Sequence, residues 1–259
     1  MVLHSEGNVD AMEYRVLARK YRPQNFKDLI GQDVLVRTLS NAFSQGRLAH
    51  AFILTGVRGV GKTTTARIIA KGINCIGADG KGGATIDPCG VCANCTGIME
   101  DRHVDVMEMD AASRTGVDDI REILDGVRYK PVTARNKVYI IDEVHMLSRN
   151  AFNALLKTLE EPPENVKFIF ATTEIRKVPV TVLSRCQRFD LKRLGMEDLA
   201  RLFSTVCQKE NITIERDALY ALGRAADGSA RDGLSLLDQS MALSVGEITA
   251  EVVQGMLGS

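Results

Sequence analysis

Residues 56 to 63 read Gly-Val-Arg-Gly-Val-Gly-Lys-Thr and match the phosphate-loop pattern G-x-x-x-x-G-K-[ST] at every fixed position. The apolar run 51–54 precedes the loop and a helical pattern follows it. Glycines let successive N–H groups turn toward an anion, and the helix directs its positive end at the same point. We therefore predict that Lys62 binds the β- and γ-phosphates of a nucleotide and that Thr63 ligates Mg²⁺. A glycine-rich turn that matches by chance is the alternative. The nucleotide-binding candidates here are Gly56, Val57, Arg58, Gly59, Val60, Gly61, Lys62, Thr63 and Thr64.

Two adjacent carboxylates, Asp142 and Glu143, follow the apolar run 137–141. Ligands of open α/β sheets bind at the carboxyl ends of the strands. We expect Asp142 to hold Mg²⁺, directly or through its water, and Glu143 to orient and deprotonate an attacking water. His145 follows the pair and is assigned no catalytic role. Thr173 ends the next apolar strand, so a hydroxyl also reaches this edge, although threonine is common in strands for other reasons.

Four cysteines follow the pattern C-x13-C-x2-C-x2-C, at Cys75, Cys89, Cys92 and Cys95. Four thiolates can close a tetrahedral shell around Zn²⁺, and short CxxC turns bring two ligands to one ion. An iron–sulfur cluster, a redox pair and four unrelated thiols are the alternatives. A closed shell has no open position, so the pattern favours a structural zinc ion over a catalytic one.

Composition and charge exclude several classes of protein. The 259 residues allow one or two domains, and 33 basic residues balance 33 acidic ones, so no global field points to nucleic acid. No apolar run approaches the roughly 20 residues of a membrane span. Residues 1–13 are polar and acidic, unlike a secretory or transit signal, and we expect a frayed arm. Clustered cysteines suit a reducing compartment, so a cytoplasmic location without membrane contact is expected.

Apolar runs and helical spacing place these groups on an α/β fold. Segment 14–32 combines basic and aromatic residues and either wraps over an adenine or packs on the core. After about 195 the strand patterns stop, which indicates a separate helical domain. Strands are expected at 51–54, 103–109, 137–141, 166–171 and 187–191, and helices at 33–45, 64–72, 120–127, 145–161, 196–209, 215–226, 230–244 and 250–257.

Together these elements resemble the AAA+ ATPases, and most closely the tau/gamma ATPase subunits of bacterial DNA polymerase III clamp loaders. The resemblance covers residues 14–258 almost continuously. It implies an AAA+ P-loop NTPase fold with a five-stranded parallel sheet, a zinc module inserted at about 75–95, and a small all-α lid. Domains are expected at 1–195 and 196–259. The segments that carry the resemblance are 17–23, 56–63, the cysteine cluster, 110–114, 141–148, 154–163, 171–173, 184–186 and 228–232.

The family also implies roles that spacing does not reveal. Arg185 looks like an arginine finger that acts on ATP in the neighbouring subunit. Thr173 looks like the first sensor, and Arg231 like a second sensor carried on the lid. The positions that resemble the adenine surround are Ala18, Tyr21, Arg22, Pro23 and Ile30. Those that resemble contacts with DNA phosphates are Arg114, Thr115 and Arg121, with solvated surface residues as the alternative.

The resemblance implies an ATPase that works with other clamp-loader subunits to load a sliding clamp onto primed DNA, with ATP, Mg²⁺ and Zn²⁺ as cofactors. The family's third helical domain, a collar, is expected to be missing because residue 259 follows the second domain. Two alternatives remain. One is another AAA+ motor, such as a Holliday-junction branch-migration helicase, and the other is a nucleotide switch or scaffold with negligible hydrolysis.

Overall fold

The computed structural model describes residues 16–114 and 116–258, so the arm expected at 1–13 lies outside the described residues. Its strands are β1 (Ala51–Thr55), β2 (Val106–Asp110), β3 (Lys137–Asp142), β4 (Val166–Thr172) and β5 (Gln187–Asp190). They form one five-stranded sheet in the order β2-β3-β4-β1-β5, and all neighbouring pairs are parallel. The α/β class and the five-stranded parallel sheet predicted from the sequence are confirmed.

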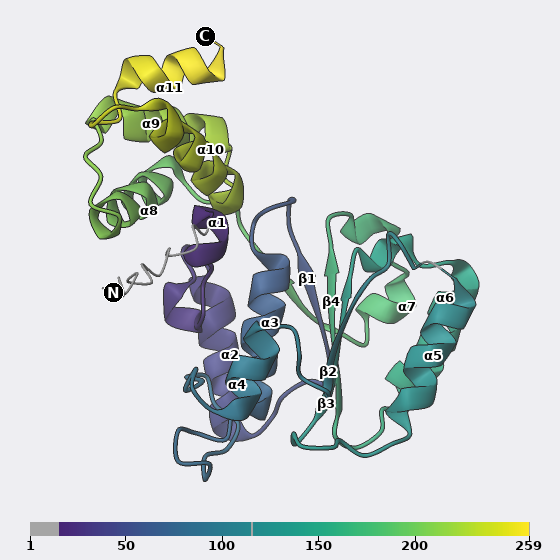
Figure 1. The fold of residues 1–259 in the computed structure, drawn as a ribbon. Coiled ribbons are helices and arrows are strands. Elements are labelled where there is room, and N and C mark those ends of the chain that lie inside the picture. Colours follow the sequence, from purple (N-terminus) through teal and green to yellow (C-terminus); the bar gives the residue numbers. More distant parts are fainter. Residues whose placement is uncertain (1–15, 115, 259) are drawn as a thin grey trace, which may run out of the picture.

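Helices cover both faces of this sheet. They are α2 (Asp33–Gln45), α3 (Lys62–Asn74), α4 (Ala93–Met99), α5 (Val117–Val127), α6 (Arg149–Glu160) and α7 (Val180–Leu183). Successive side chains of a strand point to opposite faces. In β1, Phe52 and Leu54 therefore join the hydrophobic cluster under α2 and α3, whereas Ile53 joins the cluster under α5 and α6. Figure 1 shows these two helical layers with the sheet between them.

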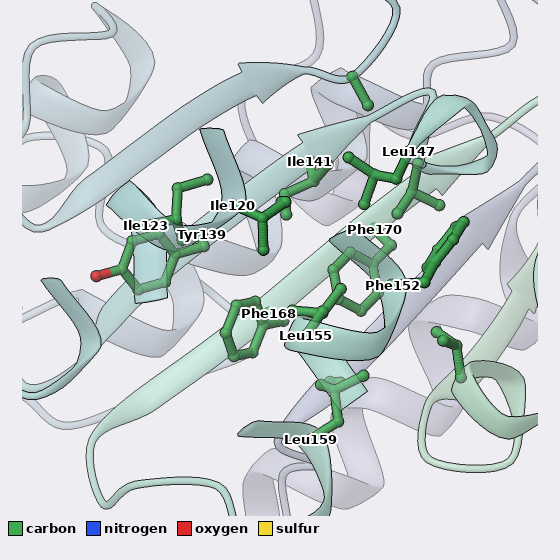
Figure 2. Close-up of a cluster of buried hydrophobic side chains, with 14 of the residues drawn as sticks. Ile120, Ile123, Tyr139, Ile141, Leu147, Phe152, Leu155, Leu159, Phe168 and Phe170 are labelled. Atoms are coloured by element: carbon green, nitrogen blue, oxygen red, sulfur yellow. The ribbon is translucent and has the colours of Figure 1, made fainter. Parts of the chain in front are cut away.

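Aromatic side chains fill the centre of the α5 and α6 face. The rings of Tyr139 and Phe168 stack with centroids 5.5 Å apart, and those of Phe168 and Phe170 with centroids 5.7 Å apart. Figure 2 shows these rings together with Ile123 of α5 and Leu155 of α6. The rings belong to β3 and β4, so their packing fixes the two strands whose carboxyl ends carry the acidic pair and Thr173.

The lid is a group of helices beyond the sheet: α8 (Met196–Lys209), α9 (Arg216–Ala226), α10 (Ala230–Leu243) and α11 (Ala250–Leu257). The short helix α1 (Leu17–Lys20) lies against it (Figure 1). Leu17 is buried in the same cluster as Phe203, and its N–H donates to Asp238 Oδ2 at 2.8 Å. The Tyr21 hydroxyl donates to Glu210 Oε1 at 2.7 Å. Residues 17–21 therefore pack with the lid, whereas Phe26 and α2 pack on the sheet.

Several expected elements differ from the observed ones: the helix expected at 120–127 begins at Val117, and the one expected at 64–72 spans Lys62–Asn74. The strand expected at 103–109 runs from Val106 to Asp110, because the Asp105 carboxylate accepts N–H groups of the 132–134 loop and holds a turn instead. The helix expected at 145–161 is a 3-10 turn, Val144–Met146, followed by α6. Ser148 starts α6 by accepting the N–H of Ala151 at 3.1 Å. None of the helices that the structure describes is long and apolar enough to cross a membrane.

Candidate nucleotide site and cysteine cluster

The phosphate loop lies between the carboxyl end of β1 and the first turn of α3. Gly59 and Gly61 have φ angles of 80° and 105°, left-handed values that disfavour any residue with a Cβ. A Cβ on Gly59 would also lie 2.4 Å from the hydroxyl oxygen of Ser229 in the lid. Glycine at this position therefore serves both the shape of the loop and the close approach of the lid.

The Lys62 ammonium is folded onto the loop. It donates to the carbonyl oxygens of Gly56 at 2.8 Å and Val57 at 2.9 Å. Burial lowers the pKa of Lys62, while the nearby carboxylates of Glu143 and Asp142 act in the opposite direction. Hydrogen bonds from an ammonium to phosphate oxygens are stronger than those to neutral carbonyls. A phosphate bound in the loop can therefore replace the two carbonyl oxygens as the partner of the Lys62 ammonium.

The carboxyl end of β3 faces the first turn of α3. Thr63 Oγ1 donates to Asp142 Oδ2 at 3.3 Å, and the N–H of Glu143 donates to Asp142 Oδ1 at 2.8 Å. Mg²⁺ holds its ligand oxygens at about 2.1 Å, so two oxygens this close suit adjacent positions in its shell. A hydroxyl and a carboxylate are also the hard oxygen donors that this ion prefers.

Glu143 leaves the strand with a φ of 49°, an uncommon value for a residue with a side chain. Its Oε2 accepts the hydroxyl of Thr173 at 2.9 Å and lies 3.5 Å from Nε2 of His145. Nδ1 of His145 lies 2.8 Å from Oγ1 of Thr172. The candidate base and the candidate first sensor are thus in direct contact, and a buried histidine lies beside them.

A cleft of about 1450 Å³ connects the phosphate loop, the acidic strand end and the lid. Gly56 does not line it, but its carbonyl oxygen accepts a hydrogen bond from the Lys62 ammonium. In its wall, Arg22 Nε donates to Thr64 Oγ1 at 2.7 Å. The nucleotide-site candidates that line the cleft are Ala18, Tyr21, Arg22, Pro23, Ile30, Val57, Arg58, Gly59, Val60, Gly61, Lys62, Thr63, Thr64, Asp142, Glu143, Thr173 and Arg231.

The lid touches the phosphate loop through the first turn of α10. Ser229 is 3% exposed, donates to the carbonyl oxygen of Gly59 at 3.1 Å and accepts the N–H of Asp232 at 3.1 Å. Two residues later, a guanidinium nitrogen of Arg231 lies 3.4 Å from the position that a Cβ on Gly59 would take. The second-sensor candidate therefore faces the loop.

Arg185 is the one catalytic candidate that does not line the cleft. Its guanidinium donates to the carbonyl of Thr181 at 2.6 Å and to Glu160 Oε1 at 3.0 Å. These partners lie in α7 and at the end of α6. The guanidinium of Arg185 thus lies beside α6 and α7 and outside the nucleotide cleft of the same chain.

The four candidate ligand cysteines converge in one cluster. Their sulfur atoms all lie within 4.8 Å of one another, and those of Cys89 and Cys95 are 4.0 Å apart. Sulfur ligands at about 2.3 Å from a tetrahedral Zn²⁺ are separated by roughly 3.8 Å, so the cluster fits this ion. The N–H groups of Cys89, Cys92 and Cys95 each donate to a sulfur of the cluster. Such bonds favour thiolates, the form that ligates metals.

Two residues from the loop before β3 hold the cysteine cluster on the core. Arg135 donates to the carbonyl oxygens of Ile73, at 3.0 Å, and Cys75. The buried side chain of Asn74 bonds both the N–H and the carbonyl of Asn136. Asn94 in α4 donates to the carbonyl of Asn74 at 2.8 Å. The module is therefore attached to the end of the phosphate-loop helix.

The candidate DNA contacts lie at the start of α5, and Thr115 is outside the described residues. The side chains of Arg114 and Arg121 are 53% and 67% exposed. Arg114 lies 3.7 Å from Asp119, and Arg121 lies 3.4 Å from Asp118. Both arginines face solvent, and their acidic neighbours lie on α5.

Three residues at the nucleotide site had no assigned role in the sequence. Asp110 pairs in register with Asp142 and lines the cleft. The rule that parallel strand ends meet at one edge could have identified it. His145 follows the acidic pair, but its contact with Thr172 depends on how β3 pairs with β4. Ser229 reaches Gly59 only because the lid docks, and no local pattern signals that contact.

A parallel sheet with a phosphate loop after β1, an acidic pair after β3 and a helical lid defines a P-loop NTPase of the AAA+ type. The Thermotoga maritima RuvB Holliday junction branch migration motor has this fold. It aligns with 92% of this chain and 72% of its own at a TM-score of 0.68 and 19% identity. A likeness at that identity shows the fold alone.

Comparison with protein families narrows the assignment from this fold class to one family. A model described as DNA polymerase III, delta subunit, matches residues 31–195, and one described as DNA polymerase III clamp loader subunit, ATPase lid domain, matches 199–246. This chain belongs to the DNA polymerase III clamp-loader family of tau and gamma subunits. It is 53% identical over 248 residues to subunit tau of Escherichia coli K12, covering 96% of this chain and 38% of that protein. It is 48% identical over 247 residues to subunit gamma of Buchnera aphidicola subsp. Acyrthosiphon pisum, covering 95% and 67%.

Proposed function

We propose that this chain is the ATP-hydrolysing subunit of a clamp loader that opens a sliding clamp and loads it onto primed DNA. The observation that carries the proposal is the convergence of Lys62, Thr63 and the pair Asp142–Glu143 on one cleft. Relatives named as DNA polymerase III subunits tau and gamma support the replication setting. The chain spans about 38% of the tau relative's length. The other loader subunits, the clamp and the DNA are partners within this proposal, and a cytoplasmic location stays a prediction.

The four side chains that converge on the cleft have different roles in hydrolysis. Lys62 binds the β- and γ-phosphates in exchange for its two carbonyl contacts. Thr63 and Asp142 hold Mg²⁺, which neutralises phosphate charge when bound. Glu143 accepts a proton from water as the water oxygen attacks the γ-phosphorus, and the bond from phosphorus to the departing ADP oxygen breaks.

The lid responds to the nucleotide through Arg231, which donates to the phosphates from the first turn of α10. The cleft wall that α1 and its following residues form, including Tyr21 and Ile30, surrounds the adenine. Because α1 packs in the lid core, both ends of the nucleotide contact elements attached to the lid. Nucleotide binding then moves the helices beyond residue 195, together with α1, against the domain that contains the sheet.

Arg185 acts on the ATP of a neighbouring subunit. Its position outside its own cleft supports this role, as does its partly exposed ion pair with Glu160. A guanidinium offered between subunits stabilises charge on the transferring phosphoryl group only after assembly. Hydrolysis is therefore low in the isolated chain and rises in the complex.

The cysteine cluster binds a structural zinc ion. Its four sulfurs supply a closed shell of ligands. The hydrogen bonds of Arg135 to the Cys75 carbonyl and of Asn74 to Asn136 connect this shell to the end of α3, so zinc binding also stabilises that end of the helix. Arg114 and Arg121 contact DNA phosphates. Their exposure supports this, and phosphates must displace acidic neighbours on α5, so the contact is weak and sensitive to salt.

The test is hydrolysis by Glu143→Gln, with Glu164→Gln, an exposed residue before β4, as the matched control. ATP binding and turnover are measured for the chain alone and then with partner subunits, clamp and primed DNA. Glu143→Gln should bind ATP normally and lose at least about 100-fold in kcat, since general-base catalysis contributes that much. Unchanged turnover rejects the assignment of Glu143. ATP binding without turnover by the unsubstituted protein in the complete set favours a nucleotide switch.

A further inference from the structure

We propose that His145 is a positioning residue that orients the carboxylate of Glu143 toward the attacking water. The inference rests on the function proposed above. The His145 side chain is 5% exposed and lies between the ends of two adjacent strands. Its Nδ1 is 2.8 Å from the hydroxyl of Thr172 on β4, and its Nε2 is 3.5 Å from Glu143 Oε2, just beyond β3.

The hydrogen bonds around Thr172 select the tautomer of His145. Thr172 is fully buried, and its Oγ1 accepts the N–H of Glu174 at 3.0 Å. A buried hydroxyl proton needs an acceptor, and within the described part of the chain Nδ1 of His145 is the one it contacts. The hydroxyl then donates to Nδ1, so the ring proton lies on Nε2. The opposite tautomer would direct the Nε2 lone pair at a carboxylate, which is repulsive.

This tautomer directs an N–H at the same oxygen of Glu143 that Thr173 contacts. Oε2 is held by these two groups, and Oε1 remains as the oxygen that accepts a proton from water. Thr173 is the closer partner of Oε2, at 2.9 Å against 3.5 Å for Nε2 of His145. Hydrogen bonds at catalytic sites commonly tighten in the catalytic complex.

His145 becomes the main restraint on Glu143 once nucleotide binds. The Thr173 hydroxyl has a single proton, which it cannot donate to Glu143 and to the γ-phosphate at once. When Thr173 turns to the phosphate, the Nε2–H of His145 still holds Oε2. The carboxylate of Glu143, just beyond the end of β3, contacts Thr173 and His145 among the described residues, so losing the first contact leaves the second.

Two substitutions at position 145 separate the two ring nitrogens. His145→Asn places its terminal amide near Nδ1 and keeps the contact with Thr172 but not that with Glu143. His145→Gln extends one bond further and presents an amide N–H near Nε2. His50→Asn, at an exposed histidine before β1, is the control for loss of an imidazole.

We expect His145→Asn to lower kcat in the complete loader by about tenfold to a hundredfold with unchanged ATP affinity, because a misplaced base costs rate and not binding. His145→Gln should retain most of the wild-type kcat. A purely structural histidine predicts the opposite: equal losses in both variants, with ATP affinity and melting temperature falling together. That result would overturn the inference, and so would a His145→Asn variant with normal kcat.

A second readout needs no hydrolysis. In the ¹⁵N-labelled chain, imidazole nitrogen chemical shifts report the tautomer, and loss of signals in His145→Asn assigns this ring among four histidines. We expect protonated Nε2 and unprotonated Nδ1, and a shift of that balance in Thr172→Val, which also lowers kcat severalfold. A proton on Nδ1 would overturn the inference. The Glu143→Gln result tests the proposed ATPase separately, so the two failures are distinguishable.

Discussion

Gly59 lies at the contact between the phosphate loop and the lid, and Gly59→Ala should force this contact open. The residue has a φ of 80°, and an added Cβ would lie 2.4 Å from the Ser229 hydroxyl oxygen and 3.4 Å from a guanidinium nitrogen of Arg231. Ser229 is buried and caps α10 through the N–H of Asp232. It therefore cannot yield to the methyl group without displacing the first turn of that helix.

Two costs combine in this variant. A left-handed backbone costs a residue with a Cβ about 1–3 kcal/mol, and an overpacked buried contact costs about 1–3 kcal/mol. Gly61 separates them, because its φ is 105° but nothing lies within 4 Å of an added Cβ. We expect Gly61→Ala to lower the free energy of unfolding by about 1–3 kcal/mol and Gly59→Ala to lower it by about 2–6 kcal/mol.

Denaturant unfolding without added nucleotide measures the free energy of unfolding of both variants. Replacing glycine by alanine lowers the conformational entropy of the unfolded chain equally in the two variants, so this contribution cancels when they are compared. Ser229→Gly in the Gly59→Ala background removes the hydroxyl oxygen and the Cβ of Ser229, which would lie 2.4 Å and 3.4 Å from the added Cβ. The double variant should recover toward the Gly61→Ala value, less about 1 kcal/mol for the lost hydrogen bond to the Gly59 carbonyl and a few tenths of a kcal/mol for the lost cap of α10. Equal destabilisation by the two alanines, or no recovery in the double variant, would refute a direct contact of lid and loop.

Two further predictions concern the metal cluster and the surface arginine. Chelation of zinc, or Cys95→Ser, should lower the melting temperature because metal binding contributes to folding; an unchanged melt after confirmed metal removal would leave zinc without a folding role. Arg185→Ala should reduce ATP turnover in the assembled loader by about 10³-fold or more and leave ATP binding intact. Loss of ATP binding, or a defect already complete in the isolated chain, would contradict a role between subunits.

The local parts of the site follow directly from short stretches of the amino-acid sequence. The phosphate loop, the Asp142–Glu143 pair and the C-x2-C-x2-C run each have their chemistry set by residues a few positions apart. The alternation of hydrophobic runs with helical spacing likewise predicted the α/β class and a separate helical domain, and the resemblance to the AAA+ ATPases implied the five-stranded parallel sheet and the lid. A strand boundary differed from the expected one where a buried polar side chain intervened: the Asp105 carboxylate binds the 132–134 loop, and β2 begins after it, at Val106.

Tertiary structure alone decided which distant groups meet. Ser229 and Gly59 are 170 residues apart, and only docking of the lid brings the hydroxyl to the carbonyl. His145 is close to Glu143 in sequence, but its contact with Thr172 depends on the pairing of β3 with β4. The physical reason is common to both cases. Periodicity records which face of an element is buried, whereas the partner on that face is chosen by sheet order and by the packing of whole elements.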